Sequence, residues 1–374
     1  MAQPAAQPAA QSAPSAAGGH GKRSAPAPII NSAEVLPDRQ VTFRIYAPQA
    51  ANVKFQSDDI NYRTMGNAWS RQMEKGGNGV WETTVGPLDP GAYRYRFMVA
   101  GVLVADPKNP EASESASCAS SLVVVPGSEF MDTKDVPHGA VAQITYYSKS
   151  LGKFRRMHIY TPPGYEKNGK EYPTLYLLHG LGDSDDCWPT VGRAGFILDN
   201  MIAAGKVRPM VVVMPALYPP YLGASVPQSA GQHDGSFTDD FLNDIMPYVE
   251  SHYRVYTDRS HRAMAGLSMG AKTTHQIVMA HLDKFSCMGL FSGGHLGGFI
   301  NTNEITNLPA FKKTMKVVFM SCGERENPAE LQASHDALEK IGMQSTVFIQ
   351  PDADHEWRVW RPSLVLFAPL LFQN

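Results

Sequence analysis

The sequence has few cysteines, almost no net charge and no long apolar run. Its four cysteines stand far apart without a C-x-x-C pair, which excludes a zinc ribbon or a disulfide framework but leaves one disulfide or four thiols open. A formal charge of −2 without a long basic run argues against a nucleic-acid partner. No run approaches the roughly 18 apolar residues of a spanning helix, so we expect no membrane insertion.

The 374 residues allow two or three domains, and 32 glycines with 28 prolines indicate a turn-rich fold rather than a helical bundle. Residues 1–28 contain no acidic, aromatic, Leu, Ile or Val residue. Such a segment cannot bury enough apolar area to offset its ordering entropy, so we expect a disordered Ala/Pro-rich tail. It also lacks the apolar stretch of a signal peptide, so the chain is either cytoplasmic or already free of its export signal.

Residues 29–126 have the pattern of a small antiparallel β-sandwich without a sizeable helix. Tyr93, Tyr95 and Phe97 alternate with arginines, as in a half-buried strand, and Gly/Pro/Asn clusters supply the turns. The expected strands are 41–46, 53–55, 80–85, 93–99 and 122–125.

Residues 127–374 alternate continuous apolar runs with helical stretches, which is typical of a parallel sheet covered on both faces. A helix is expected over residues 239–253, with a kink at Pro247. The expected strands are 174–178, 210–214, 317–320 and 345–349. The second domain is therefore predicted to be α/β.

The sharpest motif is a G-x-S-x-G pentapeptide centred on Ser268, between a short apolar run and a helix-like stretch. In this nucleophile elbow the serine sits on a strained strand-to-helix turn, and the glycines allow close backbone approach. The pentapeptide alone is a weak signal, because a glycine-rich turn with a capping serine has the same letters. Its strand and helix context favours a nucleophile.

A nucleophilic serine needs a base, and in this fold the order along the chain is serine, acid, histidine. His355 follows the last apolar strand in a polar loop and is the predicted base. His275 and His281 would lie on the helix after the elbow, too close to fold back onto Ser268, and His335 falls in a predicted helix over 328–340. His295 is the remaining histidine downstream of the elbow.

The acid is expected in the loop after the strand at 317–320, where Glu324 and Glu326 stand. Asp352 and Asp354 are less favoured, because a side chain so close to His355 in sequence usually points away from its Nδ1. A carboxylate in this position fixes the imidazole tautomer and stabilises the imidazolium. The residues alone leave the choice open.

The remaining part of such a site is an oxyanion hole. The strand at 174–178 ends in His179-Gly-Leu-Gly182, and the backbone N–H of Leu181 is expected to pair with that of Met269 to bind the developing oxyanion. The loop by itself is weak evidence, but strand, glycine-rich loop, elbow, acid loop and histidine loop occur in the right order.

Together, these motifs resemble those of a known enzyme family. From about Val136 to Phe372 the chain resembles the esterase-D-like α/β-hydrolases, specifically the family-one carbohydrate esterases that include feruloyl and acetyl xylan esterases. The resemblance implies a doubly wound, mostly parallel sheet over 127–374, with Ser268 as nucleophile, His355 as base and the Leu181 and Met269 amides as oxyanion donors. The matching text is Arg156-Met-His-Ile-Tyr-Thr-Pro-Pro-Gly-Tyr165, Leu177-Leu-His-Gly180, Asp244-Ile-Met-Pro-Tyr-Val249, Ala265-Gly-Leu-Ser-Met-Gly270, and His355-Glu-Trp357 with Trp360.

Two departures from the family pattern stand out. Ala271 replaces a second glycine after the elbow, and Glu326 stands where the family commonly has Asp. The resemblance makes Glu326 the expected catalytic acid, and its longer side chain leaves Glu324 as the alternative. The first domain resembles the immunoglobulin-like carbohydrate-binding module of glycogen-branching enzymes, through Tyr46-Ala-Pro48, Trp81 and the strand from Gly91 to Phe97. The likeness implies sugar binding. The alternative is a structural role, in which the first domain packs against the hydrolase and shapes one wall of its cleft.

The resulting hypothesis is a serine carboxylesterase that acts on feruloylated or acetylated xylan, most simply a feruloyl esterase, without metal or cofactor. An acetyl xylan esterase and a siderophore trilactone esterase are the alternatives, and a decayed, glycan-binding hydrolase is the non-enzymatic one. The candidates to bind a feruloyl ring are Trp188, Leu267 and Trp357. Packing in the core would explain each of these residues equally well. A cell-wall substrate implies a secreted or periplasmic protein. Nothing in the sequence indicates an oligomeric state.

Overall fold

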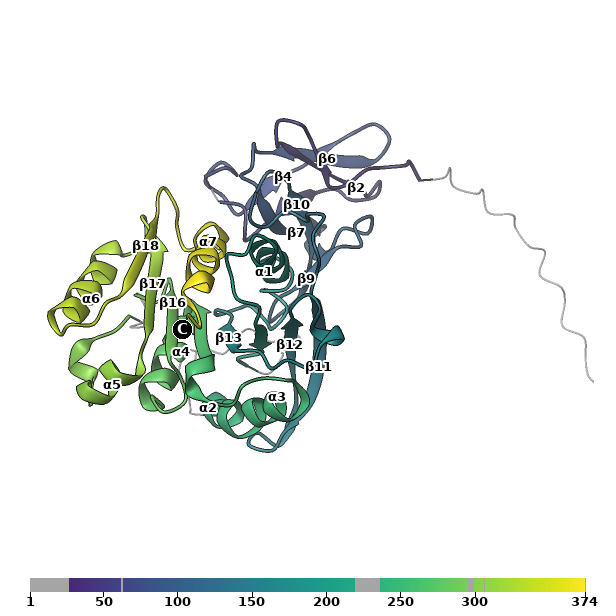
Figure 1. Cartoon of the computed structure of the whole chain (residues 1–374). Helices are drawn as coiled ribbons and strands as arrows, with labels where there is room; N and C mark the ends of the chain where they lie inside the picture. The colour runs from purple at the N-terminus through teal and green to yellow at the C-terminus, as the bar shows by residue number, and fades with distance from the viewer. Residues whose placement is uncertain (1–26, 62, 219–235, 295–298, 306, 374) are drawn as a thin grey trace, which may run out of the picture.

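A computed structural model describes residues 27–61, 63–218, 236–294, 299–305 and 307–373. The expected tail over residues 1–28 lies almost wholly outside the described residues, as does His295. The chain forms two bodies that lie against each other, a β-sandwich and a larger sheet flanked by helices (Figure 1).

The first body contains two antiparallel sheets. Phe43, Phe55, Tyr95 and Phe97 fill the space between them, all with their side chains fully buried. The described residues from 34 to 125 contain no helix, as expected. One sheet has the order β1 (Glu34–Val35), β2 (Val41–Tyr46), β6 (Val80–Val85), β5 (Glu74–Lys75), and the other β4 (Ser70–Gln72), β3 (Val53–Gln56), β7 (Gly91–Val99), β10 (Ala119–Val125), β9 (Ala112–Glu114), with β8 (Val102–Val104) beside β7.

The second body is built on one eight-stranded sheet. Its first two strands and the third pair antiparallel, and all later neighbours pair parallel, which confirms the expected mostly parallel sheet. The antiparallel hairpin at the edge carries none of the continuous apolar pattern and was not predicted. The order is β11 (Ala140–Ser148), β12 (Lys153–Thr161), β14 (Val211–Pro215), β13 (Thr174–Leu178), β15 (Arg262–Leu267), β16 (Cys287–Phe291), β17 (Val317–Gly323), β18 (Thr346–Gln350).

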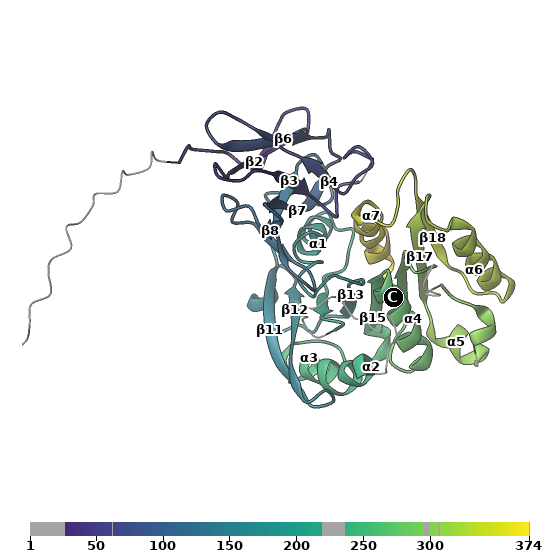
Figure 2. The ribbon, with the colours of Figure 1, turned by 180° about the vertical axis from the view of Figure 1, so that it is seen from behind.

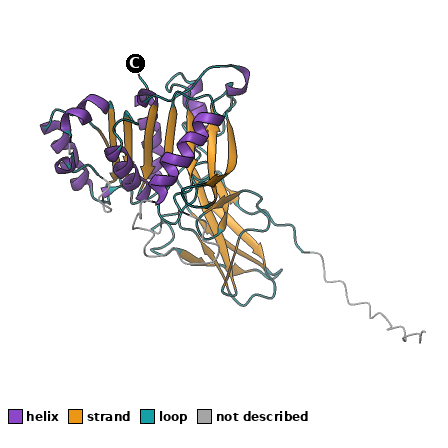
Figure 3. Ribbon diagram, turned by 90° about the horizontal axis from the view of Figure 1, so that it is seen from below, coloured by secondary structure: helices purple, strands orange, loops and turns teal. Residues whose placement is uncertain are grey.

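Helices cover both faces of this sheet, which explains why its central strands are buried along their length and mostly apolar (Figure 3). One hydrophobic cluster contains side chains of α1 (Ala194–Ala203) and α7 (Trp357–Phe367). The cluster on the opposite face contains side chains of α3 (Met246–His252), α4 (Met269–Ala280), α5 (Leu308–Thr314) and α6 (Pro328–Lys340).

The helix expected over residues 239–253 is interrupted just before Pro247. It consists of α2 (Ser236–Asp240), a π-helical segment over Phe241–Ile245, and α3. Proline has no N–H to donate to the carbonyl four residues earlier, and its ring crowds that carbonyl, so the α-helical hydrogen-bond ladder cannot run through unchanged. Where the sequence predicts a kink, the structure therefore has a π-helical segment that ends two residues before Pro247.

The sandwich rests on the loops at one end of the large sheet (Figure 2). Arg94 on β7 pairs with Asp183 at 2.5 Å, and the Ala116 N–H donates to the Gly182 carbonyl at 2.9 Å. On the other side of the contact, Arg358 of α7 pairs with Asp89 at 3.0 Å. The sandwich is therefore joined both to the loop after β13 and to the start of α7.

Candidate active site

Ser268 occupies the sharp turn between β15 and α4. Its backbone φ is +54°, a strained value for a residue with a side chain, and its N–H donates to the Phe291 carbonyl at 2.7 Å. A Cβ on Gly270 would clash with the backbone of the loop after β13, because it would meet the His179 carbonyl oxygen. The motif's second glycine is thus required for the elbow to fit under that loop.

The loop after β13 lies directly against the elbow. A Cβ on Gly180 would come within 3.1 Å of the Ser268 Cβ. The Gly180 carbonyl accepts two hydrogen bonds, from His179 Nδ1 at 2.8 Å and from the Tyr218 hydroxyl at 2.8 Å. The orientation of the peptide between Gly180 and Leu181 is therefore held from its carbonyl side.

His179 is neutral in this arrangement. Its Nε2 accepts the Leu217 N–H at 2.9 Å, so its proton is on Nδ1. The ring is 1 % exposed, and this burial lowers the pKa of His179 because the charged form is poorly solvated there.

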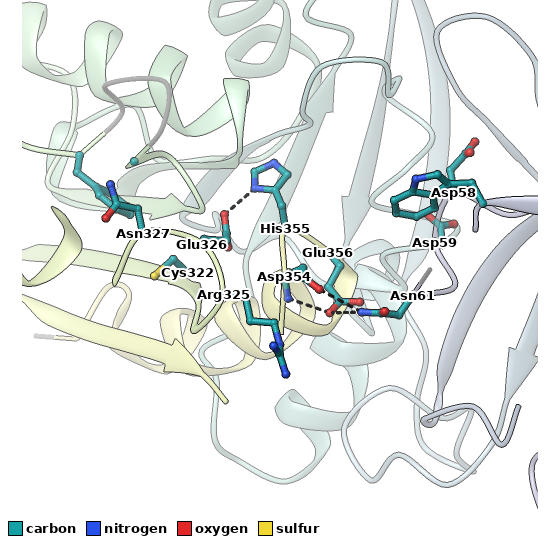
Figure 4. Close-up of a pocket in the computed structure, with 13 residues that line it drawn as sticks. Asp58, Asp59, Asn61, Cys322, Arg325, Glu326, Asn327, Asp354, His355 and Glu356 are labelled. Atoms are coloured by element: carbon teal, nitrogen blue, oxygen red, sulfur yellow. Dashed lines mark hydrogen bonds and ion pairs between the residues drawn. The ribbon is translucent and has the colours of Figure 1, made fainter. Parts of the chain in front are cut away.

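His355 and Glu326 form a close pair (Figure 4). His355 Nδ1 lies 2.6 Å from Glu326 Oε2, between the loop after β18 and the loop after β17. The Gly323 N–H also donates to Glu326, at 2.6 Å to Oε1. The Nε2 edge of the imidazole is left facing away from the carboxylate, which is the arrangement that a general base needs.

The other three carboxylates of these loops have different partners. Glu324 accepts the Asp352 N–H at 2.9 Å, and Asp352 in turn pairs with Arg325. Asp354 accepts a 2.7 Å hydrogen bond from Arg63 of the sandwich. Of the four candidate acids, Glu326 is therefore the one with a hydrogen bond to His355 among the described contacts.

Ser268 and the pair lie at the same edge of the sheet. The carbonyl that receives the Ser268 N–H belongs to the last residue of β16, and the next residue, Ser292, contacts Glu326 at 2.7 Å. Met269 begins α4, so its N–H is one of the unsatisfied donors at a positively polarised helix start. All the predicted catalytic and oxyanion positions thus follow the carboxyl ends of strands in the same parallel part of the sheet.

Two cavities between the bodies open beside His355. One of about 550 Å³ is lined by His355 and Glu326 on one side and by Asn61 and the half-exposed Trp69 of the sandwich on the other. The second, of about 330 Å³, is lined by His355, Leu181 and Trp357, together with further sandwich residues. The candidate base therefore faces a cleft that both bodies form.

The three predicted ring-binding residues have different surroundings. Trp188 and Leu267 are 1 % exposed and belong to the core cluster under α1 and α7, and the Trp188 Nε1 donates to the Leu178 carbonyl at 3.0 Å. This burial favours the packing role for both. Trp357 packs edge-on against Trp188, and it also lines the smaller cavity.

Other open questions from the sequence have structural answers. All four cysteines are free thiols. Within the described ranges no cluster of three or more His, Cys, Asp or Glu side chains could hold a metal ion. Across the same ranges we find no helix with the length and hydropathy needed to cross a bilayer.

Several residues that line or contact the site were not predicted from the sequence. Asn61, Arg63 and Trp69 lie in a loop of the sandwich, almost three hundred residues before His355, and no local pattern links such distant segments. Ser292 has a weak signal, since it directly follows an apolar strand and precedes two glycines. Its position at the carboxyl end of a strand could have marked it as a site residue.

The strand order, the two helix layers and the elbow serine define the second body as an α/β hydrolase, preceded by an immunoglobulin-like sandwich. Residues 148–368 match the Esterase family, so the chain belongs to that family of carboxylic ester hydrolases. Residues 32–108 match carbohydrate-binding module 48, the isoamylase N-terminal domain.

One curated relative matches nearly the whole chain, and another matches less than half of it. An endo-1,4-beta-xylanase/feruloyl esterase of Xylanibacter ruminicola is 32 % identical over 354 residues, which are 92 % of this chain but only 46 % of that protein. The chain thus spans less than half of that relative's length. It also matches part of endo-1,4-beta-xylanase Y of Acetivibrio thermocellus, at 28 % identity over 43 % of this chain and 15 % of the other.

Solved structures agree with the fold. A ferulic acid esterase from Anaeromyces mucronatus in complex with ferulic acid has a TM-score of 0.57 and 26 % identity, and the match covers 66 % of this chain and 96 % of that one. Enterochelin esterase from Shigella flexneri has a TM-score of 0.58 at 17 % identity, and the match covers 91 % of this chain and 94 % of the other. The second likeness concerns the fold alone.

Proposed function

We propose that the chain is a serine esterase that releases ferulate from feruloylated arabinoxylan. The observation that carries the proposal is the Glu326–His355 pair, which lies at the same end of the sheet as the elbow serine and lines a cleft between an esterase body and a carbohydrate-binding module. We choose ferulate as the acyl group because the Xylanibacter relative is a xylanase/feruloyl esterase and the Anaeromyces structure is a ferulic acid esterase with bound ferulic acid. A polymeric substrate of this kind also favours a location outside the cytoplasm.

The proposed reaction has two steps. Ser268 Oγ attacks the ester carbonyl while His355 Nε2 takes its proton, and the imidazolium then gives that proton to the departing sugar hydroxyl. A water molecule, deprotonated by His355, then attacks the acyl-enzyme; the acyl C–O bond breaks, ferulate leaves, and the imidazolium returns the proton to Ser268 Oγ. Glu326 keeps the His355 proton on Nδ1 and stabilises the imidazolium in both steps.

The backbone N–H groups of Leu181 and Met269 donate hydrogen bonds to the carbonyl oxygen and stabilise the negative charge that develops on it. In a planar trans peptide the C=O and N–H point in opposite directions. Because His179 and Tyr218 hold the Gly180 carbonyl, they also set the direction of the Leu181 N–H before substrate arrives. Preorganised donors of this kind need no reorientation during the reaction, which is the source of their contribution to rate.

The cleft supports a bulky substrate. Trp69 is 53 % exposed on the sandwich side of the larger cavity and offers an aromatic face for a sugar or a feruloyl ring. Trp357 lines the smaller cavity with Leu181, on the oxyanion side of His355. The two cavities give the acyl group and the sugar separate places on either side of the base.

The test compares wild type with Ser268→Ala on methyl ferulate, feruloylated arabinoxylan, acetylated xylan and a catecholate trilactone. We expect wild type to release ferulate and the variant to lose at least about a thousandfold in kcat. Absence of turnover on every ester, or full activity in Ser268→Ala, overturns the serine mechanism. Faster turnover of acetylated xylan or of the trilactone rejects the assignment to ferulate.

Trp69 provides a second arm of the experiment. We expect Trp69→Ala to raise KM on feruloylated arabinoxylan by roughly tenfold, since stacking and burial of an aromatic face are lost, with little change on methyl ferulate. Leu103→Ala, an exposed apolar residue on β8 of the same sandwich, is the matched control. Equal KM values for the two variants on the polymer reject a binding role for Trp69.

A further inference from the structure

Ser292 is an unpredicted polar residue in the apolar interior beside the active site. It is fully buried directly after β16, with a backbone φ of +53°, and its N–H donates to the Ser321 carbonyl at 2.7 Å. Burying a hydroxyl costs free energy unless its hydrogen bonds are satisfied. Backbone strain of this kind is a further cost, and it is found most often at functional sites.

The hydrogen bonds of Ser292 have a fixed direction. The Trp360 Nε1 donates to Ser292 Oγ at 2.9 Å, and Ser292 Oγ lies 2.7 Å from Glu326 Oε1. An indole N–H can only donate, and an ionised carboxylate can only accept. The Ser292 hydroxyl must therefore receive from Trp360 and give its own hydrogen to Glu326.

The same carboxylate holds the candidate base through its other oxygen. Glu326 Oε2 accepts from His355 Nδ1, while Oε1 accepts from both Ser292 and the Gly323 N–H. Three donors around a side chain that is only 9 % exposed leave it little freedom to rotate.

Trp360 also contacts the imidazole at the far end of this chain of hydrogen bonds. Its ring packs edge-on against the His355 ring, with centroids 5.2 Å apart and an interplanar angle of 83°. One residue of α7 thus touches the histidine directly and, through Ser292, the acid that orients the histidine. The position of both partners is tied to the same buried helix.

We infer that Ser292 and Trp360 are positioning residues that orient Glu326, and through it His355, by a directional Trp360–Ser292–Glu326 hydrogen-bond relay. The inference rests on the proposed serine esterase function, because it assigns these residues to the histidine of that mechanism. It predicts that the hydroxyl of Ser292 acts on the chemical step and on the charge of the acid, with no contact to substrate.

The first test removes the hydroxyl in Ser292→Ala and Ser292→Gly. We expect kcat on methyl ferulate to fall roughly tenfold in both with KM nearly unchanged, since one hydrogen bond to a charged group is lost. We also expect the acidic limb of the kcat/KM profile to move to higher pH by about half a unit. A carboxylate with one donor fewer carries more negative charge toward His355 and makes the imidazolium more stable.

Controls separate this effect from a structural defect. Ser321→Ala removes a buried hydroxyl one strand away that bonds to Ser363 rather than to Glu326, and it should leave the pH profile in place. Alanine, like serine, adopts the positive φ only with strain, whereas glycine adopts it freely, so a role for backbone strain alone would separate Ser292→Gly from Ser292→Ala. Every variant keeps the charged groups that line the larger cavity around His355: Asp58, Asp59, Arg325, Asp354 and Glu356.

A double-mutant cycle tests the relay itself. Trp360→Phe keeps the aromatic edge but loses the donor to Ser292, and we expect a smaller change in the same direction. In the Ser292→Ala background Trp360→Phe should cause no further shift of the pH profile, because both residues act through Glu326. Additive shifts, or an unmoved profile in Ser292→Ala at normal folded content by circular dichroism, overturn the relay. A wild type without esterase activity overturns the proposed function instead.

Discussion

The buried neutral His179 makes the stability of the oxyanion loop depend on pH. Its Nδ1–H donates to the Gly180 carbonyl and its Nε2 accepts the Leu217 N–H, so a proton added to Nε2 would face a donor. Burial lowers the pKa of His179 below the ordinary value of 6.5, which the unfolded chain retains. As the pH falls through 6.5, the unfolded state therefore takes up a proton that the folded state does not.

The size of the effect follows from that difference in proton uptake. Stability is fully present above pH 6.5 and is lost below it, because the unfolded state binds more protons there. Between pH 7.5 and pH 5 the free energy of unfolding should fall on account of His179 alone, by at most about 2 kcal/mol. His179→Asn keeps a donor toward Gly180 but cannot be protonated, so it should lack this contribution to the slope.

The assay is urea unfolding of wild type and His179→Asn, followed by tryptophan fluorescence across this pH range. The variant should be less stable at pH 7.5 by roughly 1–3 kcal/mol, since the Leu217 N–H loses its acceptor. The difference in stability between wild type and variant should then narrow toward pH 5, by at most about 2 kcal/mol. His335→Asn, at a partly buried histidine on α6, is the control. Parallel stability curves for wild type and His179→Asn would refute the neutral, buried histidine.

Two further predictions concern the loops around His355. Glu326→Ala should lower kcat on methyl ferulate by roughly a thousandfold or more, because the histidine loses its orienting acid, whereas Glu324→Ala should stay within about threefold. Similar losses in both variants would contradict the choice of acid. Arg63→Ala should lower kcat by only about threefold, since its pair with Asp354 is one third exposed on each side. Arg71→Ala, an exposed arginine on β4, is the matched control in the same rate measurement, and equal rates in the two variants would dismiss the contact.

The sequence carried much of the fold because local physics decides it. Alternating apolar residues specified β2 and β6 to the residue, and the continuous apolar run of β13 is likewise as predicted. Pro247 marked the break in the helix from its missing N–H. The antiparallel hairpin of β11 and β12 was not predicted. Its exposed positions mix polar residues with apolar ones such as Val141 and Phe154, so its pattern resembles neither a buried strand nor a clean alternation.

Site residues were predictable where a motif fixes the local backbone, and unpredictable where packing decides. Ser268 and His355 follow from an elbow and from their order along the strands, and both remain predictions until variants are assayed. Trp188 and Leu267 could not be assigned, because a buried aromatic or leucine has the same sequence appearance as one on a cavity wall. Ser292 acquires its partners only when β16, β17 and α7 come together.

The contacts from Arg94 to Asp183 and from Arg63 to Asp354 join positions that are far apart along the chain. Cutting the chain between the two bodies would consequently remove ion pairs that the loops of the hydrolase body make with the sandwich. A hydrolase body produced alone would expose carboxylates that now have cationic partners, on the two loops that flank the elbow. Anyone who exchanges the carbohydrate-binding module for another would have to carry these loop pairs along with it, as a matched set.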